Sequence, residues 1–451
     1  MTPLGTRVRL CLKDLYAQDV VEMIERETRR YEVESIEHPG HPDFGAAFDV
    51  LWGAFGGTGE MERRDVIERM LVADPTAPLP SGTYSRYFLL VARDRATGAI
   101  RGVRDGRVLL NPSYAADLCV VYLSHIFMLP DARGTVLSYW LRIAPLDLAV
   151  TYLHTLHQAG KIVLPAPDAP GRYFGMKVDL AAEMEYFSPE DKLSLQRILF
   201  YGRGGFDVID PRHFPYRQPD FRPTEEIERT GDRPVPFMLL LRRVGREREA
   251  RLPIDEARAV MELLYDDFAI FCDETHLATS LDVVLSRLEE RRAKGKNDVA
   301  LLPLPTGPHD LKRLRALFRY DVYRRHYGPG PTTDPYLQGE EARQAAASPQ
   351  WLDGELARIA EDLSRTQRFV YASRDKGFDP ESEATRAADP DALEAPAAPA
   401  PVASAAPPAA PIAPPAAARA EPAPPAPAPA AGERAREDAV PPVGAVVREA
   451  G

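Results

Sequence analysis

The first half of the chain predicts a mixed α/β (α+β) fold in which a central sheet is flanked by helices. Runs rich in apolar, β-branched and aromatic residues lie at 87–92, 119–128 and 176–184, and segments of helical periodicity separate them. The hydrophobic share of 45% over 451 residues is enough for a substantial core. Further along, apolar residues recur at helical spacing and then stop. We therefore expect a mainly helical region and a disordered tail after the mixed domain.

Three segments of different composition follow one another, and we place their boundaries at residues 1–245, 246–375 and 376–451. The first is the mixed domain and the second is the mainly helical region. In the third, residues 395–431 are mostly Ala and Pro. Proline removes backbone donors, and both residue types offer little surface to bury. We expect this Pro/Ala-rich tail to be disordered, as a spacer or as a contact for a protein partner.

The charge and the cysteines limit the function classes. A net charge of −11 argues against nucleic-acid binding, which needs clustered Lys and Arg. Cys11, Cys119 and Cys272 show no metal-ligand spacing, so we expect idle thiols in a reducing compartment and no metal. The first residues show no apolar signal region, and the apolar stretch at 118–129 is too short to span a bilayer. We expect a cytoplasmic chain with no membrane partner.

The expected elements of the first half have recognisable starts and stops. A strand at Tyr87–Ala92 leads through a turn into a return strand, and a helix begins near Gly134, with Pro145 interrupting or kinking it. Ser188 predicts the N-cap of the next helix, with Pro189 and Asp191 completing its first turn. In the helical region, three helices are expected. The first begins near Pro253, the second runs through 311–318, and the third begins at Ser348 and Pro349.

The segment from Ile126 to Ser138 joins a strand to a helix through a short turn. An apolar-x-Pro turn precedes Arg133 and Gly134, which stand where the helix should open. A helix N-terminus offers a diphosphate converging N–H groups and a favourable dipole, and glycine allows close approach to the backbone. This pattern resembles the CoA-binding core of the GNAT N-acetyltransferases, whose loop has the form R-G-x-G-x-G/A.

The resemblance implies a GNAT-like mixed central sheet that binds acetyl-CoA or another acyl-CoA. Val136 stands in place of the second glycine and narrows the loop, while Ser138 occupies the final small position. The implied CoA-binding residues are Phe127, Met128, Arg133, Gly134, Thr135, Val136, Leu137 and Ser138. In the family, two neighbouring parallel strands splay to admit the pantetheine arm; here these would be Cys119–Met128 and Met176–Met184.

A second segment, Leu199 to Phe206, resembles the family's L-Y-E-K-L-G-F segment, in which a helix ends at a tyrosine before a glycine stop. Tyr201 falls on that tyrosine, which in many members protonates the departing CoA thiolate. The alternative is a tyrosine that packs the helix end in the core. Weaker echoes at 99–102 and 214–219 extend the resemblance over approximately Tyr87 to Arg222.

The general base is less clear from the sequence. His125 has a suitable ordinary pKa, but a histidine in an apolar strand is more often a hydrogen-bonded core residue. Glu183, at the end of the next strand, is an alternative that would accept a proton through water or recognise a cationic acceptor. A solvated charge at a strand end is an equally good interpretation of Glu183, and it also applies to Glu185.

The resemblance implies an acyltransferase that moves an acetyl or longer acyl group from acyl-CoA to an acceptor amine. The amine would be a small molecule or a peptide. The alternative is a non-catalytic GNAT-like module that binds acyl-CoA or a protein partner, using the helical region or the tail for contacts. The acceptor itself has no recognisable signature in the chain.

Overall fold

The fold is described from a computed structural model, which divides the chain into two compact units, 1–396 and 397–451. The structure describes residues 18–56, 60–135, 137–165, 172–173, 175–189, 191–222, 224–231, 234–272, 274–319, 322 and 349–366, all in the first unit. The predicted tail from residue 376 lies outside these ranges. None of the described helices is long and apolar enough to cross a membrane.

The described residues form strands and helices that alternate along the chain. The strands are β1 (Tyr31–Ile36), β2 (Tyr84–Asp94), β3 (Ile100–Leu110), β4 (Leu118–Tyr122), β5 (Ile126–Met128), β6 (Arg172–Tyr173), β7 (Met176–Met184), β8 (Asp207–Ile209), β9 (Arg217–Gln218), β10 (Val235–Pro236), β11 (Met238–Arg243), β12 (Arg251–Pro253) and β13 (Asp298–Pro303). The helices are α2 (Gln18–Glu27), α3 (Phe44–Phe55), α4 (Arg64–Val72), α5 (Leu137–Gln158), α6 (Lys192–Arg203), α7 (Thr224–Thr230), α8 (Ile254–Phe268), α9 (Glu274–Ala293) and α12 (Pro349–Thr366), with 3₁₀ turns η2 (Pro130–Ala132) and η3 (Pro308–Leu317).

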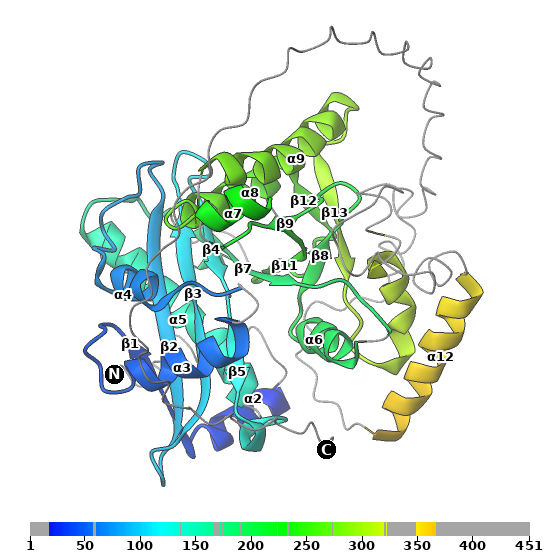
Figure 1. Ribbon diagram of the computed structural model, residues 1–451, viewed down its shortest axis with the longest axis horizontal. Helices are drawn as coiled ribbons and strands as arrows, with labels where there is room; N and C mark the ends of the chain where they lie inside the picture. The colour runs from blue at the N-terminus through cyan, green and yellow to red at the C-terminus, as the bar shows by residue number, and fades with distance from the viewer. Residues whose placement is uncertain are drawn as a thin grey trace, which may run out of the picture. The chain divides into compact units, whose positions relative to one another are not determined.

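Within the described ranges, eleven strands form one mostly antiparallel sheet in the order β1-β2-β3-β4-β7-β11-β8-β13-β12, with β5 beside β3 and β6 beside β7. The pair β4 and β7 is parallel, as the family resemblance implies for the strands that contain Cys119–Tyr122 and Met176–Met184. In Figure 1 these two strands lie between the early strands with α5 and the later strands with α8 and α9. The mixed α/β architecture with flanking helices is confirmed.

Helices cover both faces of the sheet. On one face, α2, α5 and α6 pack over apolar side chains of β2, β3, β4 and β7, and this layer forms the largest core cluster. On the other face, α8 and α9 cover the later strands, while α3 and α4 cover the early ones. We call these the α5/α6 face and the α8/α3 face. A ligand that enters between two strands of this sheet would therefore meet different side chains on the two faces.

The predicted strand at 119–128 is wrong in one respect, because it is broken into β4 and β5. Arg107 of β3 pairs with Tyr122 and Arg104 pairs with Ile126, so three residues (123–125) lie opposite two (105–106). One extra residue on a strand produces a bulge that bends it away from its former course. Because of this bend, β5 stays hydrogen-bonded to β3 but does not continue alongside β7.

Other expectations differ in detail. Pro145 lies inside one continuous helix, α5, and does not end it. The cap of α6 is Asp191 and not Ser188, because the Asp191 carboxylate accepts a hydrogen bond from the N–H of Leu193 at 2.9 Å. The second pattern of the helical region forms the 3₁₀ turn η3.

The boundary proposed at residue 245 separates strands that belong to one sheet. Strand β13 pairs with β8 and β12 pairs with β13, so the segment after residue 245 completes the sheet of the first segment. The helices α8 and α9 then pack on that same sheet. The two segments therefore share a core.

Candidate functional site

The parallel strands β4 and β7 separate at a defined point. Their ladder runs from Leu118↔Lys177 to Tyr122↔Ala181, and the N–H of Leu123 still donates to the carbonyl of Ala181 at 2.8 Å. Beyond it, β5 pairs with β3 and the end of β7 pairs with β11. Among the described residues no ladder pair joins β5 to the end of β7, so the two strands fork after Ala181.

The loop predicted to hold a diphosphate leads from β5 into α5. Gly134 has a φ of +72°, is exposed, and has no atom within 4 Å of the place a Cβ would take. The Thr135 hydroxyl donates to the carbonyl of Ala132 and lies 3.4 Å from the N–H of Leu137, and the Ser138 hydroxyl donates to the carbonyl of Thr135. These contacts shape an open turn at a helix N-terminus. Val136 lies outside the described residues.

Arg133 is exposed, and its side chain lies back along β5. Its Nε donates to the carbonyl of Met128 at 3.1 Å, and its guanidinium carbon lies 5.6 Å from the ring centroid of Phe127. Met128 also pairs with Gly102 of β3. The predicted CoA-binding residues on either side of the turn are thus brought together.

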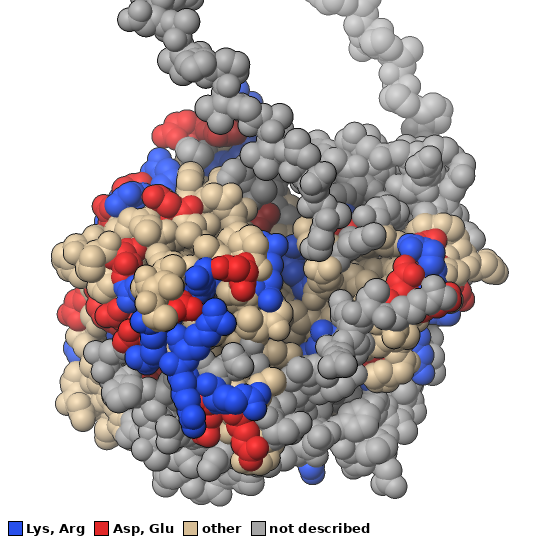
Figure 2. Space-filling view, turned by 90° about the horizontal axis from the view of Figure 1, so that it is seen from below, with Lys and Arg blue, Asp and Glu red and all other residues tan. Residues whose placement is uncertain are grey.

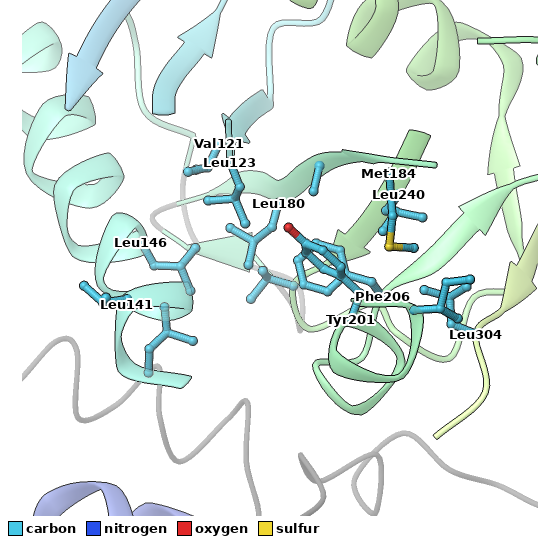
Figure 3. Packing of buried hydrophobic residues seen from close by; sticks show 14 of the residues in the cluster. Val121, Leu123, Leu141, Leu146, Leu180, Met184, Tyr201, Phe206, Leu240 and Leu304 are labelled. Carbon is cyan, nitrogen blue, oxygen red and sulfur yellow. The ribbon is translucent and has the colours of Figure 1, made fainter. Parts of the chain in front are cut away.

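Tyr201 lies near the end of α6, buried between two aromatic rings. Its ring meets those of Phe200 and Phe206 edge to face, with centroids 5.4 and 5.1 Å away. Figure 3 shows its hydroxyl pointing from α6 toward Leu180 of β7 and Leu123, the residue after β4. The hydroxyl therefore approaches the fork from the α5/α6 face.

Glu183, on the diverging end of β7, approaches the fork from the opposite face. Its carboxylate accepts hydrogen bonds from Tyr122 at 2.5 Å, from Gln218 at 2.9 Å and from the hydroxyl of Tyr216. Burial raises the pKa of Glu183, although these three donors oppose the shift. The residue as a whole is half-buried and its carboxylate is held by these three donors, so burial makes the group more basic while the hydrogen bonds limit the increase.

His125 lies in the bulge, and both of its ring nitrogens are engaged. Nδ1 is 2.9 Å from a carboxylate oxygen of Asp105, and Nε2 is 3.0 Å from the carbonyl oxygen of Glu60. Burial lowers the pKa of His125, but Asp105 outweighs it and raises the pKa to about 9. Two acceptors around one ring favour the protonated imidazolium, which is a poor proton acceptor at neutral pH.

A buried charge network extends from His125 along the α8/α3 face. Arg107 donates to Glu62 at 2.5 Å, forms an ion pair with Asp267 at 2.5 Å, and lies 3.3 Å from the Ser124 hydroxyl. Burial raises the pKa of Asp267 to about 6, against the effect of Arg107. This network links β3 to the loop before α4 and to α8, and it holds the bulge in place.

Two arginines near Tyr201 are not anticipated from the sequence. Arg104 of β3 and Arg142 of α5 are both fully buried on the α5/α6 face. The guanidinium of Arg142 lies over the ring of Phe200, 3.5 Å from its centroid. For Arg142, a charged residue inside the apolar run 140–146 is the signal that would have found it, although such residues are more often exposed. Arg104 stands among Arg101, Asp105 and Arg107 and carries no such signal.

One further group of side chains has metal-like spacing. Glu34, His41 and Asp43 lie together at the edge of β1, but Arg93 donates to Glu34 at 2.7 Å and forms an ion pair with Asp43. Arg93 therefore already supplies a cation to two members of that group.

On one face of the molecule, Figure 2 shows adjacent Lys and Arg side chains bordered by acidic ones, so this acidic chain is locally basic.

Comparisons with known proteins add little. No family model matches the sequence, and no curated protein matches it. Among solved structures, an aminoglycoside acetyltransferase from an uncultured soil metagenomic sample, in complex with trehalose, aligns with 39% of this chain and 87% of its own. The identity is 12% and the TM-score is 0.25. A similarity this low assigns neither fold nor activity.

Proposed function

We propose that this chain is an acyltransferase of the GNAT type, which transfers an acetyl or related acyl group from acyl-CoA to an acceptor amine. The observation that carries the proposal is the fork between β5 and β7, with the Tyr201 hydroxyl directed at it. The order of parts agrees with the resemblance: strand, Arg-Gly turn, helix, parallel strand, helix ending at a tyrosine, and final strand.

In this proposal the pantetheine arm enters between the diverging strands, and the diphosphate lies on the turn before α5. The open, left-handed Gly134 and the N-terminal N–H groups of α5 suit an anion. The side chain of Arg133, held over β5, adds positive charge beside that turn.

The chemistry divides between the two faces of the sheet. The amine nitrogen attacks the thioester carbonyl carbon, the C–S bond breaks, and Tyr201 gives its proton to the leaving sulfur. Glu183 takes the proton that the amine loses, directly or through water, because its raised pKa and partial exposure suit a base. We prefer Glu183 to His125, because two acceptors around the imidazole favour its protonated form, which takes up no further proton.

Ligand binding is the first test of this function. Acetyl-CoA should raise the melting temperature, since a ligand at roughly 100 times its Kd stabilises the folded state by about 2.7 kcal/mol. No stabilisation by acetyl-CoA or a longer acyl-CoA would overturn the proposal.

The second test follows thiol release with a panel of amines. Tyr201→Phe keeps the ring packing and should lower kcat by about 10²–10⁴, the range for losing a general acid. Tyr152→Phe is the matched control, because Tyr152 is a buried tyrosine whose hydroxyl bonds the carbonyl of Pro75. Stabilisation without acceptor-dependent thiol release would instead favour the non-catalytic binding module.

A further inference from the structure

Arg104 occupies an unusual place for a charged side chain. It lies in the middle of β3, where it pairs with Leu90 of β2 on one side and with Ile126 of β5 on the other. Side chains directly opposite one another share a face of the sheet, and Leu90 belongs to the core under α5 and α6. The guanidinium of Arg104 is therefore buried on the Tyr201 side of the sheet, with 0% of the residue exposed.

No carboxylate forms an ion pair with this guanidinium among the described residues. The Tyr201 hydroxyl is the polar group within hydrogen-bonding reach of it, although none of its three nitrogens meets a partner there in good geometry. Arg107, three residues along the same strand and equally buried, has Glu62 and Asp267 as carboxylate partners on the opposite face. Burying a charged group without a counter-ion is costly, so an unpaired guanidinium in a core needs an explanation.

The ionisable groups around Arg104 are the Tyr201 phenol, the cation of Arg142 and the carboxylate of Asp105, the next residue of β3, which lies on the opposite face. Burial lowers the pKa of Arg104, the nearby Tyr201 opposes that shift, Arg142 adds to it by charge repulsion, and Asp105 opposes it. Arg142 lies against the ring of Phe200, the residue before Tyr201. Both guanidinium groups thus lie near the end of α6 that presents the Tyr201 hydroxyl, and the charge of Arg104 creates a positive potential there in a dry environment.

We propose that Arg104 stabilises the negative charge on the CoA sulfur as the thioester breaks. This inference rests on the proposed function. When the C–S bond breaks, its electron pair stays on the sulfur, beside the guanidinium. Tyr201 then gives its proton to the sulfur, and the resulting phenolate shares the same cation until water returns a proton. A fixed charge in a water-excluded site stabilises such an anion far better than solvent does.

The CoA diphosphate is another anion that a buried arginine could bind. Desulfo-CoA separates the two sources of negative charge, because it keeps the diphosphate and lacks the thiol. A thiolate site acts on CoA alone and only where the thiol ionises, whereas a diphosphate site acts on both compounds at every pH.

The experiment measures the thiol pKa of bound CoA from the ultraviolet absorbance of its thiolate, and the affinities of CoA and desulfo-CoA. Wild-type protein should hold the bound thiol at a pKa of about 7.5 or below, from about 8.5 for a free thiol. Arg104→Met should return the thiol pKa to its free value and leave the affinity for desulfo-CoA unchanged. Arg104→Lys, which keeps the charge, should retain part of the shift.

Each other outcome overturns the inference. A thiol pKa that is unshifted in the wild type excludes a thiolate site while leaving the acyltransferase proposal intact. Equal loss of affinity for CoA and desulfo-CoA in Arg104→Met assigns the guanidinium to the diphosphate. If wild-type protein binds neither compound, the proposed function fails first and the inference fails with it. Thermal unfolding checks the fold, and Arg104→Met should melt no lower than wild type because it removes an unpaired buried charge.

Discussion

Nδ1 of His125 lies 2.9 Å from Oδ1 of Asp105, and the same carboxylate oxygen accepts the backbone N–H of His125. One acidic side chain of β3 therefore ties down the side chain and the main chain of the bulge between β4 and β5. Asp105 also accepts a hydrogen bond from Tyr87 at 2.9 Å. The histidine that the sequence offers as a base thus serves, in this geometry, to shape the fork.

Stability should fall as the pH rises through the titration of His125. Its folded pKa of about 9 exceeds the ordinary 6.5, so the folded state binds the proton more tightly. The stabilisation is complete below about pH 6.5 and is lost on going to pH 9, at roughly 1.4 kcal/mol per pKa unit, or about 3 kcal/mol in all.

Urea unfolding at several pH values between about 6 and about 10 measures this dependence. His125→Gln keeps a polar side chain that does not titrate, so its stability should vary less across that range. Equal pH dependence in the two proteins would contradict the assignment of the charge to His125.

Replacing the carboxylate of Glu183 should reduce turnover without weakening acyl-CoA binding. Glu183→Gln removes the proposed base, and a loss of about 10²–10⁴ in kcat is expected. In the wild type, the raised pKa of Glu183 should move the acidic limb of the rate profile above the ordinary range for a glutamate. Steady-state kinetics from acidic to neutral pH would show both effects.

Glu185→Gln is the matched control for that variant. Glu185 lies two residues after Glu183, just beyond the end of β7, and forms an ion pair with Arg197 outside the fork. Its replacement should leave kcat near the wild-type value. A Glu183→Gln variant as active as this control would place the base elsewhere.

Gly106 should not tolerate a side chain, because it lies where β3 passes the bulge. A Cβ there would overlap the carbonyl oxygen of Tyr122 and lie 2.6 Å from the ring of Phe88. Gly106→Ala should therefore lower the free energy of unfolding by about 1–3 kcal/mol. Gly53→Ala offers a contrast, because this helical glycine has open space around it; it should be neutral or stabilising by up to about 1 kcal/mol. Urea unfolding compares the two, and equal effects would argue against close packing at the bulge.

Local patterns predict the elements around the fork well where the signal is contained in one segment. The apolar run at Met176–Met184 matches β7 at both ends, and the glycines after Arg203 end α6. The sequence misplaces the cap of α6 because Ser188 and Asp191 are both good capping residues, and only the hydrogen bond to Leu193 decides between them. Strand β13 escapes prediction because it is a short strand between helical segments.

The buried charges could not be predicted because their partners are distant in sequence. Arg107 would be placed at the surface by its type, yet Glu62 and Asp267 neutralise it from other parts of the chain. The break between β4 and β5 is also non-local, since it depends on register against β3. The catalytic assignment of Tyr201, and that of the Arg-Gly turn, stay predictions that rest on the family resemblance and on the fork.

The turn before α5 offers a last prediction, because Gly98 provides a matched glycine with nearly the same φ. Gly134 has a φ of +72° and Gly98, at the tip of the β2–β3 hairpin, has a φ of +69°; at neither glycine does an atom lie within 4 Å of the place a Cβ would take. Alanine at either position should cost about 1–2 kcal/mol, the penalty for a left-handed non-glycine residue. Only Gly134→Ala also places a methyl group on the proposed diphosphate-binding turn, so it alone should weaken acyl-CoA binding. Calorimetric titration with acetyl-CoA checks this, and equal affinities of the two variants would remove the turn from the binding site.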